Sequence, residues 1–188
     1  LTSFELKVPY LDVHPEGGQQ ASGLSDMNVA INRVVAFSRA NLWLTSVGLE
    51  LSLPTGSESR GLGTGEVVWE PFVRAGWDWH RVVIQGQVVL EFPQKTADVN
   101  SLIVYNLAIG RYFQPDPRLQ ITPMVEFNSE TVIVGSNRGD TKSVVLPQLR
   151  ARWLLWSAGV GVEVPVTGLR DFNVRPMFDV TYEYTPFW

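Results

Sequence analysis

The sequence predicts an all-β fold, an antiparallel up-and-down transmembrane β-barrel of about 10 strands, or of 12 if N-terminal strands are missing. Three observations predict it. Apolar and polar residues alternate with period two over long stretches, long and short connections alternate along the chain, and aromatic residues gather beside the short connections. A transmembrane helix is not expected, because the 188 residues contain no window of 18 apolar residues.

The period-two alternation is clearest between Glu66 and Trp79, and it recurs over residues 81–92 and 173–186. A helix would instead repeat its apolar residues every three and four positions. Most of the strands predicted in this way exceed the roughly 5–6 residues typical of soluble proteins and reach the roughly 9–11 that cross a bilayer. The predicted strands span residues 2–11, 25–37, 42–53, 66–78, 81–92, 99–113, 118–129, 142–150, 153–164 and 173–185.

The connections between these strands alternate strictly in length. Tight turns are predicted at 38–41, 78–80, 114–117 and 150–153, and longer polar connections at 12–24, 54–65, 93–98, 129–141 and 165–172. Outer-membrane barrels have short periplasmic turns and longer external loops. The sequence therefore predicts one domain over residues 1–188, integral to a bacterial outer membrane, with both termini in the periplasm. The absence of a basic, then apolar, opening segment indicates that any signal peptide has been removed.

Aromatic residues lie within a few positions of the short turns or of the last residue. Amphipathic rings favour the headgroup layer of a membrane, so this row predicts a periplasmic aromatic girdle. Its predicted members are Trp43, Trp77, Trp79, Trp153, Trp156 and Trp188.

The polar faces of the strands favour a membrane barrel over a soluble one. They carry few lysines, three in the whole chain, whereas soluble β-proteins commonly place lysines at exposed edges. A soluble lipocalin-like carrier, with its apolar face inward, stays open as the alternative.

Several short motifs resemble a known family of outer-membrane proteins. They are the stretch from Val47 to Gly56 (VGLELSLPTG), the run GLGTG at 61–65, WEPF at 69–72, GLSD at 23–26 and ELKVPY at 5–10. Together they resemble the family described as "MetA-pathway of phenol degradation", a group of transporter-like proteins. The resemblance implies an outer-membrane β-barrel that helps hydrophobic or aromatic compounds to enter the cell.

The C-terminal segment from Phe178 to Trp188 resembles the β-signal, an alternating strand with an aromatic end. This likeness implies that the barrel-assembly machinery is a partner. With a net charge of −4, nucleic acid is not an expected partner.

Catalysis is not predicted. Asp78 and His80 are better explained as a turn at the membrane interface than as a catalytic dyad. The glycine-rich run 56–65 lacks the GK[ST] ending of a phosphate loop. The chain has two histidines and no cysteine, so neither a metal nor another cofactor is expected.

Inward-facing residues predict two zones in the lumen. An apolar vestibule toward the outside would comprise Val68, Phe72, Val89, Leu102, Val104, Val144 and Leu146. A charged constriction would comprise Glu70, Arg74, Asp78, Arg81, Arg150, Arg152, Asp179 and Glu183. The predicted function is passive uptake of small, hydrophobic or aromatic solutes across the outer membrane. A non-conducting structural or docking barrel, with side chains filling the interior, is the second alternative.

Overall fold

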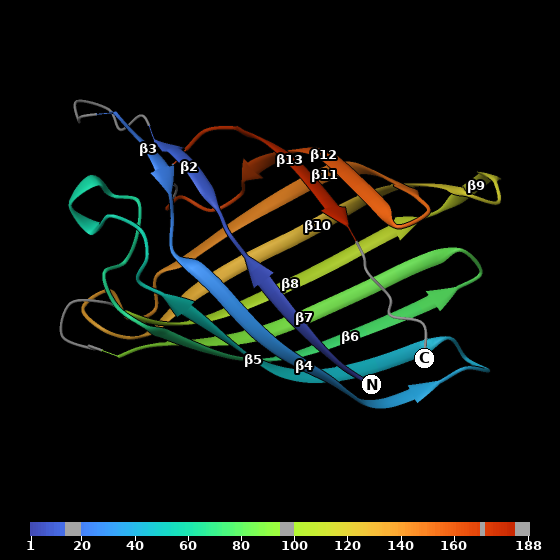
Figure 1. The fold of residues 1–188 in the computed structure, drawn as a ribbon, viewed down its shortest axis with the longest axis horizontal. Coiled ribbons are helices and arrows are strands. Elements are labelled where there is room, and N and C mark those ends of the chain that lie inside the picture. Colours follow the sequence, from blue (N-terminus) through green and yellow to red (C-terminus); the bar gives the residue numbers. More distant parts are fainter. Residues whose placement is uncertain (14–19, 95–99, 170–171, 183–188) are drawn as a thin grey trace.

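A computed structural model describes residues 1–13, 20–94, 100–169 and 172–182. Most of them belong to one antiparallel sheet, in which strands follow each other in the order β1-β4-β5-β6-β7-β8-β10-β11-β12-β13 (Figure 1). The strands of this path are β1 (Thr2–Lys7), β4 (Met27–Ser38), β5 (Trp43–Leu53), β6 (Val68–Trp79), β7 (Val82–Pro93), β8 (Ser101–Arg111), β10 (Leu119–Val134), β11 (Thr141–Trp153), β12 (Trp156–Pro165) and β13 (Arg175–Tyr182).

The structure confirms the predicted all-β, antiparallel, up-and-down sheet, and it adds elements to the connections. The strand predicted at 2–11 ends at Lys7, before Pro9, which has no N–H group to donate to a ladder. The chain then forms a separate hairpin of β2 (Tyr10–Val13) and β3 (Ala21–Leu24). The short strand β9 (Phe113–Asp116) pairs with β10, and a 3₁₀ turn covers Glu58–Arg60. None of the helices in the described part of the chain is long and apolar enough to span a bilayer.

The two ends of the sheet differ in their connections. At the short-turn end, residues 39–42, 80–81, 117–118 and 154–155 link neighbouring strands. His80 and Arg81 both have positive φ, as the two central residues of a type I′ hairpin turn require. The opposite, long-loop end holds the β2–β3 hairpin and the loop that contains the 3₁₀ turn, at the left of Figure 1.

The sheet curls, with β1 and β13 in front and β7, β8 and β10 behind them in Figure 1. Its first and last strands are β1 and β13, and the described residues of these two strands form no backbone ladder with each other. The described sheet is therefore a curled layer with two edges, and the ladder that would close the predicted barrel is not among its pairings.

The residues on the inner face of the curl pack closely. Phe72 and Val89 are cross-strand partners on β6 and β7, and both are buried. Glycines make room for large neighbours: a Cβ atom at Gly48 would lie 2.2 Å from Cζ of Phe72, and one at Gly110 would lie 2.6 Å from Cβ of Met124. Curvature brings these side chains together, so glycine on this face allows the sheet to bend.

The loop between β5 and β6 folds onto the long-loop end instead of extending away from it. The buried carboxylate of Asp26 accepts hydrogen bonds from the backbone N–H groups of Gly56 (2.9 Å) and Thr64 (2.6 Å). Leu62 is almost fully buried, and Arg60 donates to the carbonyl of Ser22 on β3. The glycine-rich run thus forms a compact cover that is tied to the β2–β3 hairpin.

Candidate functional site

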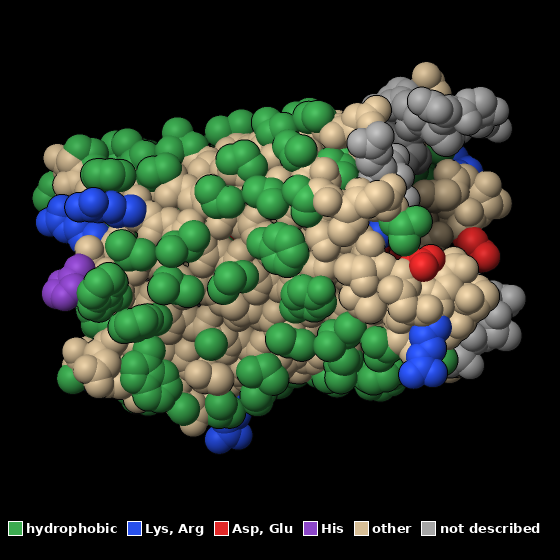
Figure 2. Space-filling model, turned by 180° about the vertical axis from the view of Figure 1, so that it is seen from behind, with side chains coloured by type: hydrophobic (Ala, Val, Ile, Leu, Met, Phe, Trp, Pro, Cys, Tyr) green, Lys and Arg blue, Asp and Glu red, His purple; other side chains and the backbone are tan. Residues whose placement is uncertain are grey.

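The outer face of the curled sheet is apolar. Strand register places Trp69, Val73 and Trp77 of β6 on this face, and all three are exposed. The same register puts nearly every charged residue of the ten paired strands on the inner face, and the exceptions are Arg33 and Arg111. Figure 2 shows hydrophobic side chains spread over the back of the sheet, with charged side chains and a histidine toward its ends.

The described members of the predicted girdle all lie at the short-turn end and are exposed. Trp43 and Trp77 are cross-strand partners, and the indole N–H of Trp77 donates to the carbonyl of Asn41 at 3.0 Å. The ring of Trp79 lies 6.2 Å from that of Trp77. Trp153 pairs with Trp156 across the β11–β12 turn. The last predicted member, Trp188, lies outside the described residues.

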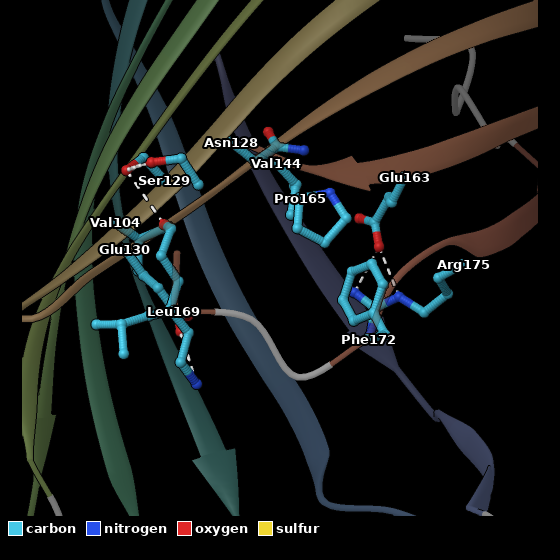
Figure 3. Close-up of a pocket in the computed structure, with 12 residues that line it drawn as sticks. Val104, Asn128, Ser129, Glu130, Val144, Glu163, Pro165, Leu169, Phe172 and Arg175 are labelled. Carbon is cyan, nitrogen blue, oxygen red and sulfur yellow. Dashed lines mark hydrogen bonds and ion pairs between the residues drawn. The ribbon is translucent and has the colours of Figure 1, made fainter. Parts of the chain in front are cut away.

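A pocket of about 300 Å³ opens on the inner face near the long-loop end, between β10, β11, β12 and the segment before β13 (Figure 3). Its wall contains an ion pair: the carboxylate of Glu163, 6% exposed, accepts from the guanidinium of Arg175 at 2.5 Å. That guanidinium also covers the ring of Phe172 at 4.4 Å. The remaining lining residues are Val104, Asn128, Ser129, Glu130, Lys142, Ser143, Val144, Pro165 and Leu169.

A second cavity of about 410 Å³ lies on the inner face closer to the short-turn end. Much of its lining consists of amide side chains: Asn32, Gln85, Gln87, Asn106 and Asn128. The side-chain oxygens of Asn32 and Asn106 are buried and accept no hydrogen bond from any described residue. Two free acceptors at one cavity favour a bound molecule, or water, that donates hydrogen bonds.

A polar network ties β1 to the middle of the sheet across the inner face. The ammonium group of Lys7 lies 2.9 Å from the carboxylate of Glu50, which also accepts from the side chain of Asn28. Arg74 on β6 donates to Gln87 at 2.6 Å and lies 3.9 Å from the carboxylate of Glu5 on β1. Because β4 and β5 separate these two strands, the Glu5–Arg74 contact requires strong curvature.

Another ion pair lies on the inner face near the short-turn end. Arg150 of β11 reaches Asp179 of β13 at 3.4 Å. Gly159 of the intervening strand β12 leaves room for it, since a Cβ atom there would lie 2.2 Å from Oδ1 of Asp179. At the same end of the sheet, on the β6–β8 side, Tyr112 hydrogen bonds to Asp78; burial raises the pKa of the Tyr112 phenol above its ordinary value, and this hydrogen bond raises it further.

The predicted vestibule residues share the inner face and are spread over β6, β7, β8 and β11. Phe72, Val89 and Val104 lie in one row across β6, β7 and β8. Val68 and Leu102 lie nearer the long loops of the same strands, whereas Val144 and Leu146 lie on β11. Val104 and Val144 line the 300 Å³ pocket together with its ion pair, so that pocket is partly ionic.

The predicted constriction residues are brought together only in part. Arg150 pairs with Asp179, and Arg74 faces the 410 Å³ cavity. Glu70 lies instead opposite Glu50, in the long-loop half of the sheet. The other described members, Asp78, Arg81 and Arg152, lie at the short-turn end, and Glu183 lies outside the described residues.

The Glu163–Arg175 pair and the two free amide oxygens were not predicted from the sequence. Strand alternation indicates that Glu163 and Asn106 face inward, but their partners depend on the register of strands that are distant in sequence. Among the described residues, no three histidine, aspartate or glutamate side chains are grouped as a metal site would require. Comparison of the chain with protein-family models and with curated proteins gave no match.

Proposed function

We propose that the chain is an outer-membrane β-barrel that allows small solutes to cross passively. The observation that carries this proposal is the outer face, whose strand residues are apolar and carry few charges. An exposed apolar surface of this extent is unfavourable in water and favourable in hydrocarbon. The exposed tryptophans at one end match the position of aromatic residues at a membrane interface.

A membrane setting requires the sheet to close, because hydrocarbon offers no partner to an unpaired backbone N–H or C=O group. The path of ten strands supports closure. Since strand direction alternates along it, β1 and β13 run in opposite directions, and a β1–β13 ladder would be antiparallel like the other pairings. In this arrangement the inner face becomes the lumen, and both termini lie on the periplasmic side with the short turns.

The solutes we propose are small molecules with a hydrophobic or aromatic body and a hydrogen-bonding group. The 300 Å³ pocket offers Val104, Val144 and Phe172 to the apolar body. The 410 Å³ cavity then offers the free oxygens of Asn32 and Asn106 to a donor group. Removal of apolar area from water contributes roughly 25 cal/mol per Å², so a small pocket captures such a solute weakly and releases it.

The sequence resemblance to the transporter-like family described above agrees with this role. The β-signal likeness begins within β13, at Phe178, and supports assembly by the barrel-assembly machinery. A catalytic role has no support in the site, and we propose a transport protein, not an enzyme.

Solute flux through liposomes that contain the purified protein tests the proposal. Gly76 lines the 410 Å³ cavity, and a Cβ atom at this position would meet no heavy atom within 4 Å. The variant Gly76→Phe is therefore expected to fill the cavity without disturbing the fold and to reduce flux of a monoaromatic solute at least about tenfold. Val88→Phe, on the outer face of the adjacent strand and outside the cavity lining, is the control and should conduct normally.

Two results would overturn the proposal. Flux no greater than that of protein-free liposomes would favour the non-conducting structural or docking barrel. The close packing of Phe72 against Gly48 on the inner face also favours this alternative. A protein that stays monodisperse in buffer without detergent would favour the soluble lipocalin-like carrier.

A further inference from the structure

Four of the arginines at the short-turn end lie in its turns or at the end of a strand. Arg39 lies in the β4–β5 turn, Arg81 in the β6–β7 turn, Arg111 at the end of β8 and Arg118 in the β9–β10 turn. We call these four residues the arginine rim. All four are exposed, and none of their guanidinium groups lies within 4.0 Å of a carboxylate of the described residues.

Two members of the arginine rim, Arg81 and Arg111, have adjacent backbones. Arg111 is the cross-strand partner of Val82, the residue that follows Arg81, and the N–H of Tyr112 donates to the carbonyl of Arg81 at 2.9 Å. The nearest carboxylate in sequence to Arg118 is Asp116, and it accepts from the backbone N–H of Arg118. Positive charges gathered at one end of the sheet favour an anion there, and no carboxylate of the described residues is paired with them.

The turns beside the arginine rim expose apolar tips. Leu42 and Leu154 have φ values of 51° and 56°, and both are exposed. A residue with a Cβ atom is disfavoured in this left-handed region, where glycine or asparagine is usual. Leucine at two such tips, next to Trp77 and Trp153, gives the short-turn end an apolar surface directly beside its charges.

The long-loop end lacks this combination in the part of the chain that is described. Its loops carry both signs, with Glu58 two residues before Arg60 and Arg138 two residues before Asp140. The Arg60 guanidinium is already engaged by the carbonyl of Ser22. Among the described residues, an excess of positive charge beside exposed aromatic and leucine side chains is therefore found at the short-turn end.

We propose that the arginine rim binds the phosphate groups of anionic phospholipids in the leaflet that meets the short turns. The inference rests on the membrane location proposed above. A guanidinium group matches a phosphate in a bidentate arrangement, and the tryptophan rings and leucine tips fit the boundary between headgroups and acyl chains. Each arginine near an anionic surface is expected to favour an anionic over a neutral lipid by about fivefold.

Fluorescence quenching by brominated lipids tests this inference. In a Trp69→Phe background, the described tryptophans all lie at the short-turn end and report lipids that touch it. The protein is inserted into phosphatidylcholine vesicles in which either phosphatidylglycerol or phosphatidylcholine is brominated. We expect brominated phosphatidylglycerol to quench with at least about fivefold higher relative affinity, and the variant R39Q/R81Q/R111Q/R118Q to reduce this ratio to about one.

Two controls separate charge from location. Replacing the same four arginines by lysine keeps the charge and should keep most of the preference, and Arg138→Gln, at the opposite end, should leave it unchanged. If the glutamine variant does not fold, high salt applied to the unmodified protein performs the same test, because screening should abolish the preference. Equal quenching by the two lipids would overturn this inference alone. A protein that neither lipid quenches would overturn the membrane location as well.

Discussion

The outer and inner faces of the sheet are built from the same strands but carry opposite kinds of side chain. On β6, Trp69 and Val73 point outward and are exposed, whereas Glu70 and Arg74 point inward. On the inner face, carboxylates as well as apolar side chains are buried, and Glu50 and Glu163 are 4% and 6% exposed. The alternation of residues determines which side chains share a face, and the surrounding medium determines which face is stable on the outside.

A charge added to the outer face is expected to have the largest effect. Val88 is 45% exposed in the middle of β7, and Val88→Arg should lower the free energy of unfolding in lipid vesicles by about 2–4 kcal/mol. Gln85→Arg, on the inner face of the same strand, should change it by less than about 1 kcal/mol. Denaturant titration of the inserted protein measures both variants. Equal losses would contradict the assignment of lipid to the outer face.

Within the inner face, the two partners of the pocket ion pair should respond unequally. Arg175→Met leaves the buried carboxylate of Glu163 without its partner. It should therefore lower the free energy of unfolding by about 1–3 kcal/mol. Glu163→Gln leaves the more exposed guanidinium of Arg175 near a neutral acceptor and should cost less than half as much. The same denaturant titration compares them. A larger loss for Glu163→Gln would mean that the carboxylate is not the buried member of the pair.

The close approach at Gly159 predicts a smaller effect. In Gly159→Ala the new methyl group would push against Asp179 and separate it from Arg150, at a cost of about 1 kcal/mol. Gly76→Ala is the matched control, because nothing lies within 4 Å of the new atom. In thermal unfolding in detergent, Gly159→Ala should have a lower midpoint temperature than Gly76→Ala. The reverse order would argue against a packed inner face at β12.

The smallest expected effect is the pH dependence from Tyr112. Its folded pKa is raised above the ordinary value near 10, so its contribution to stability is present below pH 10 and is lost as pH rises through the folded pKa. Phenolate absorbance, compared between the unmodified protein and Tyr112→Phe, should show one tyrosine that titrates late. The difference between the two titration curves isolates Tyr112. If its midpoint equals that of free tyrosine, the pKa of Tyr112 is not raised and the hydrogen bond to Asp78 is absent.

Much of the fold could be predicted because period-two alternation is a local signal. The strand predicted at 81–92 is found at Val82–Pro93, and the one at 42–53 at Trp43–Leu53. The β2–β3 hairpin was missed because the alternation simply continues past Lys7, and only the pairing of Tyr10 with Leu24 shows that the strand has ended.

The candidate site was predicted less well, since it depends on contacts between distant strands. Alternation places Arg74 and Glu70 on one face, but it does not show that Arg74 approaches Glu5 while Glu70 faces Glu50. The ion pair of Glu163 and Arg175 similarly requires the β12–β13 register. Membrane insertion, barrel closure and transport stay predictions that the experiments above address.

The anchoring of the β5–β6 loop has a practical consequence for protein engineering. Asp26 holds both legs of this loop, at Gly56 and at Thr64, and the 3₁₀ turn at Glu58–Arg60 lies between them. A foreign peptide inserted after Ser59 would start and finish on legs fixed by the same carboxylate. The tip is thus a suitable graft site for epitope display, and strand register on either side should tolerate the insertion.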